Sequence, residues 1–153
     1  MPLSQKDALV EQLTERCEFI ETAEENYAPL VFHAEGGVTN GTVLTKFRRG
    51  AFVPLKTVLP VFLEYEYNIV SPSYDCILGL ELFVLIACSS PVANQVARLH
   101  LFPEFTPNDY LWKTHKRDFK EKWEIYAWAI HNFLSTTFDI PENPQQNRDK
   151  VNY

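Results

Sequence analysis

The spacing of the apolar residues changes along this chain from helical to alternating and back again, and this change limits its fold more than any other feature. Helical spacing near the N-terminus predicts a helix closed by Pro29, built on the stripe Leu9, Leu13, Cys17 and Ile20. Strict alternation predicts strands over 57–67 and 97–101. Helical spacing then returns, with one face formed by Phe119, Trp123, Tyr126, Ile130 and either Phe133 or Leu134. Interleaved helices and strands predict one compact unit of the α/β class.

Prolines, glycines and charges refine the limits of these elements. Pro60 lacks a backbone donor, so the strand over 57–67 is expected to begin there, to lie at an edge or to carry a bulge. Glu64 and Glu66 alternate with apolar residues in that strand, which predicts one solvated face. The short apolar run 30–32 predicts a buried strand that enters a glycine turn. The sequence Thr106-Pro107-Asn108-Asp109 predicts the start of a helix.

The segment 76–88 is apolar except for a single charge, that of Glu81. It is shorter than the ~20 residues that a membrane-spanning helix needs. One interpretation is a helix inside the core. The other is a helix pressed into a membrane surface or a partner protein, and the sequence leaves both open.

Length, charge and cysteine content exclude several classes of protein. The 153 residues correspond to about one domain, and 14 basic against 20 acidic side chains give a net charge of −6. A nucleic-acid binder would normally show a basic excess on one face, so nucleic acid is not an expected partner. The three cysteines form no Cys-x-x-Cys pair, which predicts neither a zinc site nor a disulfide framework and favours an intracellular compartment. We divide the chain into a domain over 1–140 and a polar arm over 141–153.

The segment 30–65 carries the strongest chemical signal. An apolar run leads into the turn Glu35-Gly36-Gly37, a second turn follows at Asn40-Gly41, and three cations come next, Lys46, Arg48 and Arg49. Backbone amides at a glycine turn can face an anion, and the cations bring positive charge close to them. The pattern indicates an anion or phosphate site, with a solvated basic loop as the alternative.

At these residues the chain resembles the PlsC-type glycerolipid acyltransferases, and more narrowly the lysophospholipid acyltransferase branch. The blocks that match, in order, are Glu35-Gly36, Thr39-Asn40-Gly41, Phe47, Gly50-Ala51-Phe52-Val53-Pro54 and Pro60-Val61. The resemblance covers roughly residues 20–140, and its specific motifs lie within 35–61. It implies binding of the phosphate or glycerol end of an acceptor, with these residues at the site: Glu35, Gly36, Thr39, Asn40, Gly41 and Pro60.

The chain departs from the family pattern where the chemistry is done. The Phe-Pro that precedes the Glu in the family is His33-Ala34 here, and the Thr that follows the Gly is Gly37. The family uses a His-x-x-x-x-Asp pair, in which the His is the general base for the acceptor hydroxyl. The residues five positions after the four histidines here are Val38, Phe105, Lys120 and Thr136. The resemblance therefore extends to the C-terminal half of the domain without the catalytic pair, and no catalytic residue is predicted.

The resemblance implies a partial three-layer sandwich, a mixed sheet flanked by helices, which a partner completes or covers because exposed strand edges are otherwise a liability. We expect a catalytically inactive, acyltransferase-like accessory or structural subunit of a larger membrane-associated complex. One alternative is the C-terminal half of a split enzyme whose catalytic His and Asp come from another chain. Another is a lipid-binding module.

The expected ligands and partners follow from these alternatives. We expect no tightly bound cofactor and no metal, with acyl-CoA or phospholipid as candidate ligands, and other subunits or a membrane surface as partners. A mitochondrial membrane complex is favoured over the endoplasmic reticulum. Contacts to anions or lipid headgroups are expected from Lys46, Arg48 and Arg49, and from the basic run that contains Lys113, Lys116 and Arg117.

Overall fold

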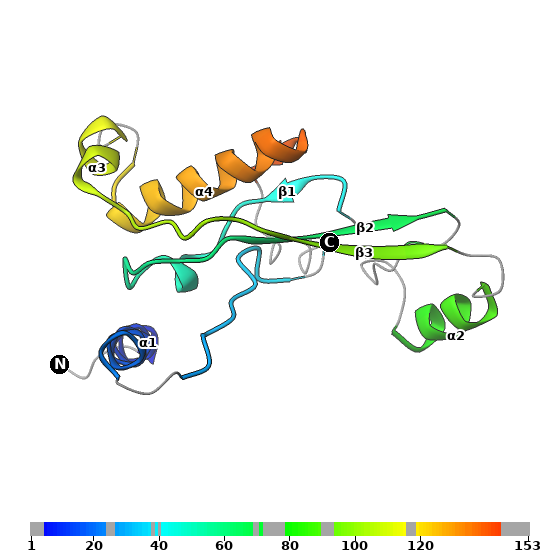
Figure 1. Cartoon of the computed structure of the whole chain (residues 1–153), viewed down its shortest axis with the longest axis horizontal. Coiled ribbons are helices and arrows are strands. Elements are labelled where there is room, and N and C mark those ends of the chain that lie inside the picture. Colours follow the sequence, from blue (N-terminus) through cyan, green and yellow to red (C-terminus); the bar gives the residue numbers. More distant parts are fainter. Residues whose placement is uncertain are drawn as a thin grey trace.

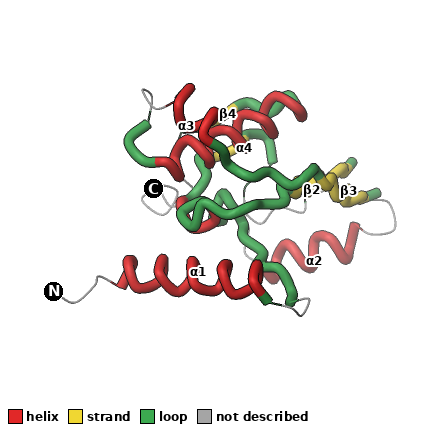
Figure 2. The backbone as a smooth tube through the Cα atoms, turned by 60° about the vertical axis from the view of Figure 1, so that its left-hand side comes forward, coloured by secondary structure: helices red, strands yellow, loops and turns green. Residues whose placement is uncertain are grey.

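The chain forms an α/β fold in which short strands lie between two groups of helices. The computed structural model describes residues 5–23, 27–37, 39, 41–68, 71, 79–89, 94–115 and 119–144. Helices α3 (Asp109–His115) and α4 (Lys122–Phe138) lie on one side of the strands, and α1 (Gln5–Thr22) and α2 (Gly79–Ser89) on the other (Figures 1 and 2). This arrangement confirms the predicted α/β class.

Strands β2 (Val61–Tyr67) and β3 (Gln95–Leu101) form an antiparallel ribbon in which Val61 pairs with Leu101 and Tyr67 with Gln95. The strand begins directly after Pro60, as predicted, because proline has no amide to donate to the ladder. Both strands of the alternating pattern are thus confirmed. They pair with each other across a sequence gap that contains α2.

One end of the ribbon's polar face contacts α4, and its apolar face is exposed. On the polar face Phe62 stacks on Phe138 of α4, with ring centroids 4.0 Å apart, and Glu64 pairs with His100 at 2.9 Å. The register places five large apolar side chains together on the other face, and they are 45–65% exposed. These side chains are Val61, Leu63, Tyr65, Leu99 and Leu101. The prediction of one solvated face is confirmed only in part, because Glu66 and Arg98 are exposed on it, whereas Phe62 on the same face packs on α4.

Helix α4 supplies most of the core. Its buried residues Tyr126, Ile130 and Leu134 pack against the 44–52 segment, where Leu44, Phe47 and Phe52 are buried. Between the two predicted alternatives, Leu134 faces the core, whereas Phe133 is 43% exposed. A capping box at Glu121 begins the helix, and Asp139 in the left-handed conformation ends it.

The phenol of Tyr126 connects three segments. Its hydroxyl donates toward the carbonyl oxygens of Lys56 and Phe105, at 2.8 and 2.9 Å, and its side chain has no exposed surface. Burial raises the pKa of Tyr126, because the charged phenolate would lose its hydration. Tyr126 therefore fixes α4 to the two segments that leave the same end of the ribbon, before β2 and after β3.

A second, shorter sheet holds the C-terminal segment. Strand β1 (Leu44–Thr45) pairs in parallel with β4 (Glu142–Asn143), so that Leu44 lies opposite Glu142. The short 3₁₀ helix η1 (Arg49–Ala51) follows β1. The start of the predicted polar arm is therefore joined to the domain at β1, and residues 145–153 lie outside the described residues.

Several local predictions need correction. The run 30–32 forms no strand, and Val31 is 83% exposed, because no described strand lies beside it to complete a ladder. Helix α1 ends at Thr22, well before Pro29. The start of α3 is as predicted, but the side chain that caps it is Asn108, whose Oδ1 accepts from the amide of Leu111 at 3.0 Å.

The core-helix interpretation of 76–88 is wrong. Leu82 is the buried residue of α2, whereas Leu80 is 77% and Phe83 69% exposed. The alternative, contact with a membrane or a partner, stays a prediction. In the part of the chain that the structure describes, no helix has both the length and the apolar character that crossing a bilayer requires.

Candidate functional site

The candidate site is built where the turn at Glu35-Gly36 meets β1. The amide of Gly36 donates to the carbonyl of His33 at 2.9 Å, which closes the turn, and Gly36 has a φ of +68°. Most side chains avoid that left-handed conformation, so the turn favours glycine here. The turn directs the side chain of Glu35 toward β1.

Glu35 binds Thr45 through two hydrogen bonds to one carboxylate oxygen. The Oε1 atom of Glu35 accepts from the amide of Thr45 at 2.7 Å and from its hydroxyl at 2.8 Å. Thr45 is buried, so both donors would otherwise lack a partner. The acid that the family motif places at the acceptor site thus has a structural task in this chain, which is to hold the turn against β1.

Arg48 lies directly over the same turn. Its amide donates to the carbonyl of Ala34 at 2.7 Å, and its side chain occupies the space that a Cβ on Gly36 would need. Glycine is therefore favoured at position 36 by the backbone conformation, and a Cβ there would also displace the side chain of Arg48. The guanidinium brings a positive charge to the turn, which suits an anion because hydrogen bonds to charged groups are the strong ones.

The other predicted residues of this segment neighbour Arg48 in the sequence or lie in a separate turn. Lys46 and Arg49 are exposed on either side of Arg48. Gly41, with a φ of +76°, donates its amide to the hydroxyl of Thr39 at 3.4 Å and forms a separate turn. We call the segment 33–49 the Glu35 loop.

The remaining predicted residues belong to other parts of the molecule. Pro60 is buried at the start of β2, and Lys113 is exposed on α3. Three further predicted residues, Asn40, Lys116 and Arg117, lie outside the described residues. The structure thus brings Glu35, Gly36 and Arg48 together, while the rest of the predicted set is not gathered at that point.

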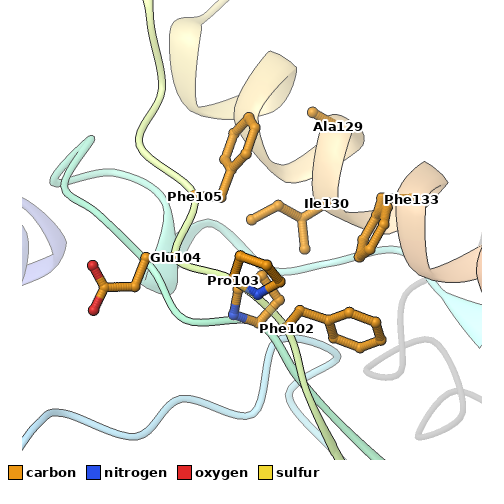
Figure 3. A pocket seen from close by; sticks show the side chains of 8 residues that line it. Phe102, Pro103, Glu104, Phe105, Ala129, Ile130 and Phe133 are labelled. Carbon is orange, nitrogen blue, oxygen red and sulfur yellow. The ribbon is translucent and has the colours of Figure 1, made fainter.

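Pro60 lines an apolar groove of about 280 Å³ between the ribbon and α4. Figure 3 shows the side chains of Phe102, Ile130 and Phe133 turned toward one another there, while the carboxylate of Glu104 points away from them. The carbonyl of Pro60 accepts from the amide of Phe102 at 3.1 Å. The groove offers apolar surface rather than a polar site.

A second pocket, of about 330 Å³, lies where α4 meets the ends of β1 and β4. Its walls are rich in aromatic rings, so we call it the aromatic pocket. It begins at Lys46 and Phe47, directly after the residue that Glu35 holds. The Glu35 loop and the aromatic pocket are therefore adjacent along β1.

His131 lies at the aromatic pocket and was not singled out by the sequence. It is 8% exposed, its Nδ1 lies 3.4 Å from a carboxylate oxygen of Glu142, and its ring meets the edge of Phe47 with centroids 4.8 Å apart. Its Nε2 is buried and has no hydrogen-bond partner among the described residues. One available signal was its position in the apolar stripe of α4, four residues after Ala127 and eight after Trp123.

Metal ligands and cysteines offer no further candidate site in the part of the chain that the structure describes. No group of three or more His, Cys, Asp or Glu side chains there could hold a metal ion. Among the cysteines, Cys17 is partly buried, and burial together with Glu21 and Glu18 raises the pKa of its thiol, whereas Lys56 opposes them. A raised pKa makes this thiol a poor nucleophile.

Comparison with known proteins gives one relationship. The chain is similar to the lysophospholipid acyltransferase LPEAT1 of Arabidopsis thaliana, with 29% identity over 107 residues. The match covers 70% of this chain but 24% of the plant protein, so the chain spans about a quarter of the length of the curated relative that it matches. No family model matches the chain. No solved structure matches it. The match therefore indicates that the chain is related to an acyltransferase.

Proposed function

We propose that these 153 residues form an acyltransferase-like unit that binds the phosphate of a glycerolipid at the Glu35 loop and that has no acyl-transfer activity on its own. The observation that carries the proposal is the position of Arg48 over Gly36, with Lys46 and Arg49 exposed beside it. A phosphate monoester or diester is the anion that such a site on a lysophospholipid acyltransferase-like chain would meet.

The geometry of Glu35 supports binding rather than catalysis. Its Oε1 atom accepts both hydrogen bonds from Thr45, which gives this carboxylate a structural task in fixing the turn. A fixed turn holds the backbone of Arg48 in one position, which reduces the entropy lost when an anion binds.

The proposed lack of activity rests on the histidines. None of the four is followed by an aspartate five residues later, so a general base of the family type is not among these residues. We therefore propose more specifically that the chain is an accessory subunit of a membrane-associated complex and retains a phospholipid site.

Binding is tested with lysophosphatidic acid below its critical micelle concentration, followed by chemical shifts of backbone amides. We expect shifts at Gly36 and Arg48, and binding about fivefold weaker or more in Arg48→Gln, since hydrogen bonds to charged groups are the strong ones. Lys113→Gln is the matched control, because Lys113 is an exposed cation on α3. Equal loss in the two variants would contradict the proposed site.

A second candidate is one half of a split acyltransferase, whose catalytic His and Asp come from another chain. The exposed apolar face of the β2–β3 ribbon favours it, because further strands or a covering element would bury that face. The test is to purify the native assembly and assay acyl-CoA-dependent acylation of a lysophospholipid. Activity that needs this chain and a partner with a His-x-x-x-x-Asp motif supports the split enzyme, whereas activity independent of this chain contradicts it.

A further inference from the structure

The aromatic pocket begins directly after Thr45, the residue of β1 that Glu35 binds, and apart from Lys46 its lining belongs to no predicted site. Its volume of about 330 Å³ lies at the small end of the range for ligand pockets, which fits a headgroup or a small metabolite rather than an acyl chain. Its lining comes from α4, from the segment that precedes α4 and from the ends of β1 and β4.

Four aromatic side chains line the pocket, namely Phe47, Phe119, Trp123 and Trp128. Two of them are held by neighbours. The indole N–H of Trp123 donates to a carboxylate oxygen of Glu121 at 2.6 Å, and Trp128 stacks obliquely on Phe119 with ring centroids 5.8 Å apart. Aromatic faces attract cations, and indole does so most strongly.

Acidic groups outnumber basic ones around the pocket. Glu124 and Glu142 contribute two negative charges against the one positive charge of Lys46, a balance of −1 while His131 is neutral. Glu124 is fixed, since its Oε2 accepts from the amides of Lys120 and Glu121 at 2.9 and 3.2 Å. Glu142 is held at the edge of β4 beside His131.

Aromatic walls with two carboxylates form a site for an organic cation rather than for an anion or a neutral apolar group. A metal ion is not the fitting ligand, because these acids belong to no cluster of three or more metal-ligating side chains within the described residues. Lys46 opposes a cation by its charge, but its flexible and exposed side chain can turn toward solvent or toward the acid part of a zwitterion.

We propose that the aromatic pocket binds an alkylated ammonium group, with Trp123 and Trp128 contacting its methyl or methylene groups and with Glu124 and Glu142 providing the countercharge. The cation can be a free amine or the ammonium end of a lipid headgroup, since both present the same chemistry. The inference does not require that the Glu35 loop bind phosphate.

The test is calorimetric titration of the full chain with choline chloride at constant ionic strength. The neutral analogue 3,3-dimethyl-1-butanol has the same shape without the charge. We expect choline to bind and the neutral analogue to bind at least about fivefold more weakly, since the cation–π contribution acts on the charge alone. Equal affinity for the two compounds, or no binding of choline, overturns the proposal.

Two variants and one control locate the binding. Trp123→Leu and Glu142→Gln should each weaken choline binding severalfold, and Glu142 is half exposed, so its replacement leaves the fold intact. Trp112→Phe is the control, because Trp112 lies outside the pocket and is covered by the ammonium of Lys122 at 5.6 Å. Loss of binding in Trp112→Phe equal to that in Trp123→Leu contradicts the assignment.

A second ligand, monomeric dihexanoyl phosphatidylcholine, distinguishes a lipid headgroup from a free amine as the source of the cation. Tighter binding of this lipid than of choline, lost in both Glu142→Gln and Arg48→Gln, identifies a headgroup that bridges the pocket and the Glu35 loop. Lipid binding that depends on Arg48 but not on Glu142 supports the phosphate site alone. If choline still binds through Glu142, that result assigns the pocket to a free amine, and if choline binding is also independent of Glu142, it overturns the ammonium site. Loss of the phosphate site with choline binding intact would leave the present inference standing.

Discussion

The carboxylate of Glu35 accepts hydrogen bonds from both the amide and the hydroxyl of Thr45, at 2.7 and 2.8 Å, and so joins the glycine turn to the buried strand β1. Because both bonds end on one oxygen and Thr45 is buried, the pair is a structural joint beneath a basic surface.

Glu35→Ala should lower the free energy of unfolding by about 2–3 kcal/mol, because it leaves two buried donors of Thr45 without a partner. Glu35→Gln should cost less, about 1 kcal/mol, since the amide oxygen still accepts both bonds without the charge. Urea denaturation measures both values. Equal and negligible effects would show that the joint does not stabilise the fold.

Gly36→Ala should destabilise the protein more than Gly41→Ala does. Both positions have positive φ, so each substitution carries the backbone cost of about 1 kcal/mol or more. A Cβ on Gly36 additionally collides with the side chain of Arg48, whereas nothing lies near a Cβ on Gly41. The comparison uses thermal unfolding, and a larger effect at Gly41 would be inconsistent with this packing.

Tyr126→Phe should destabilise the fold by about 1–3 kcal/mol, because the carbonyl groups of Lys56 and Phe105 lose a buried donor while the ring packing is kept. The measurement is the midpoint of urea unfolding. Leu134→Ala, which removes buried methyl groups from the same helix, gives a reference effect of about 2–5 kcal/mol.

The free energy of unfolding should also fall at alkaline pH, because the phenol of Tyr126 ionises more readily in the unfolded chain than in the folded protein. Burial raises the pKa of Tyr126 in the folded state above the ordinary value of 10.0. Below that ordinary value the phenol is neutral in both states, and its contribution is complete. As pH rises above it, the unfolded chain ionises first, so the folded state loses stability progressively. Tyr126→Phe should flatten the decline between pH 10 and the alkaline limit of the measurement, and an unchanged slope would contradict the assignment.

Substitutions on the two faces of the ribbon should change the free energy of unfolding by different amounts. Leu99→Thr should change the free energy of unfolding by less than about 0.5 kcal/mol, because that side chain is 61% exposed. Phe62→Ala should cost about 2–3 kcal/mol, because the half-buried ring stacks on Phe138 and packs against the core. Equilibrium denaturation of both variants, with Leu63→Thr as a second exposed case, checks the assignment.

The periodic elements were predictable because each depends on local spacing. The strand that begins after Pro60, the strand that ends at Leu101 and the last helix all lie where alternation or helical spacing placed them. The run 30–32 failed because a strand needs a neighbouring strand, which no local pattern supplies. The segment 76–88 is helical as its composition allowed, but burial depends on what surrounds a helix, and α2 is mostly exposed.

The candidate site was predictable only in part. The glycine turns and the cations predict an anion site by residue type, and the structure brings Gly36 and Arg48 into contact beside Glu35. Thr45 could not be identified, because a threonine ten residues from a glutamate carries no signal of contact. His131, Glu142 and the aromatic rings come together only because β4 returns to pair with β1.

The amino-acid sequence by itself determined the α/β class, the positions of the helices and ribbon strands, and the glycines that a left-handed turn requires, because these follow from interactions between residues close along the chain. Only the tertiary structure decided which face of the ribbon is buried, that Glu35 holds β1, and that an aromatic pocket with two acids forms beside it. Those features depend on contacts between distant segments, and their free energy exists only once the chain is folded.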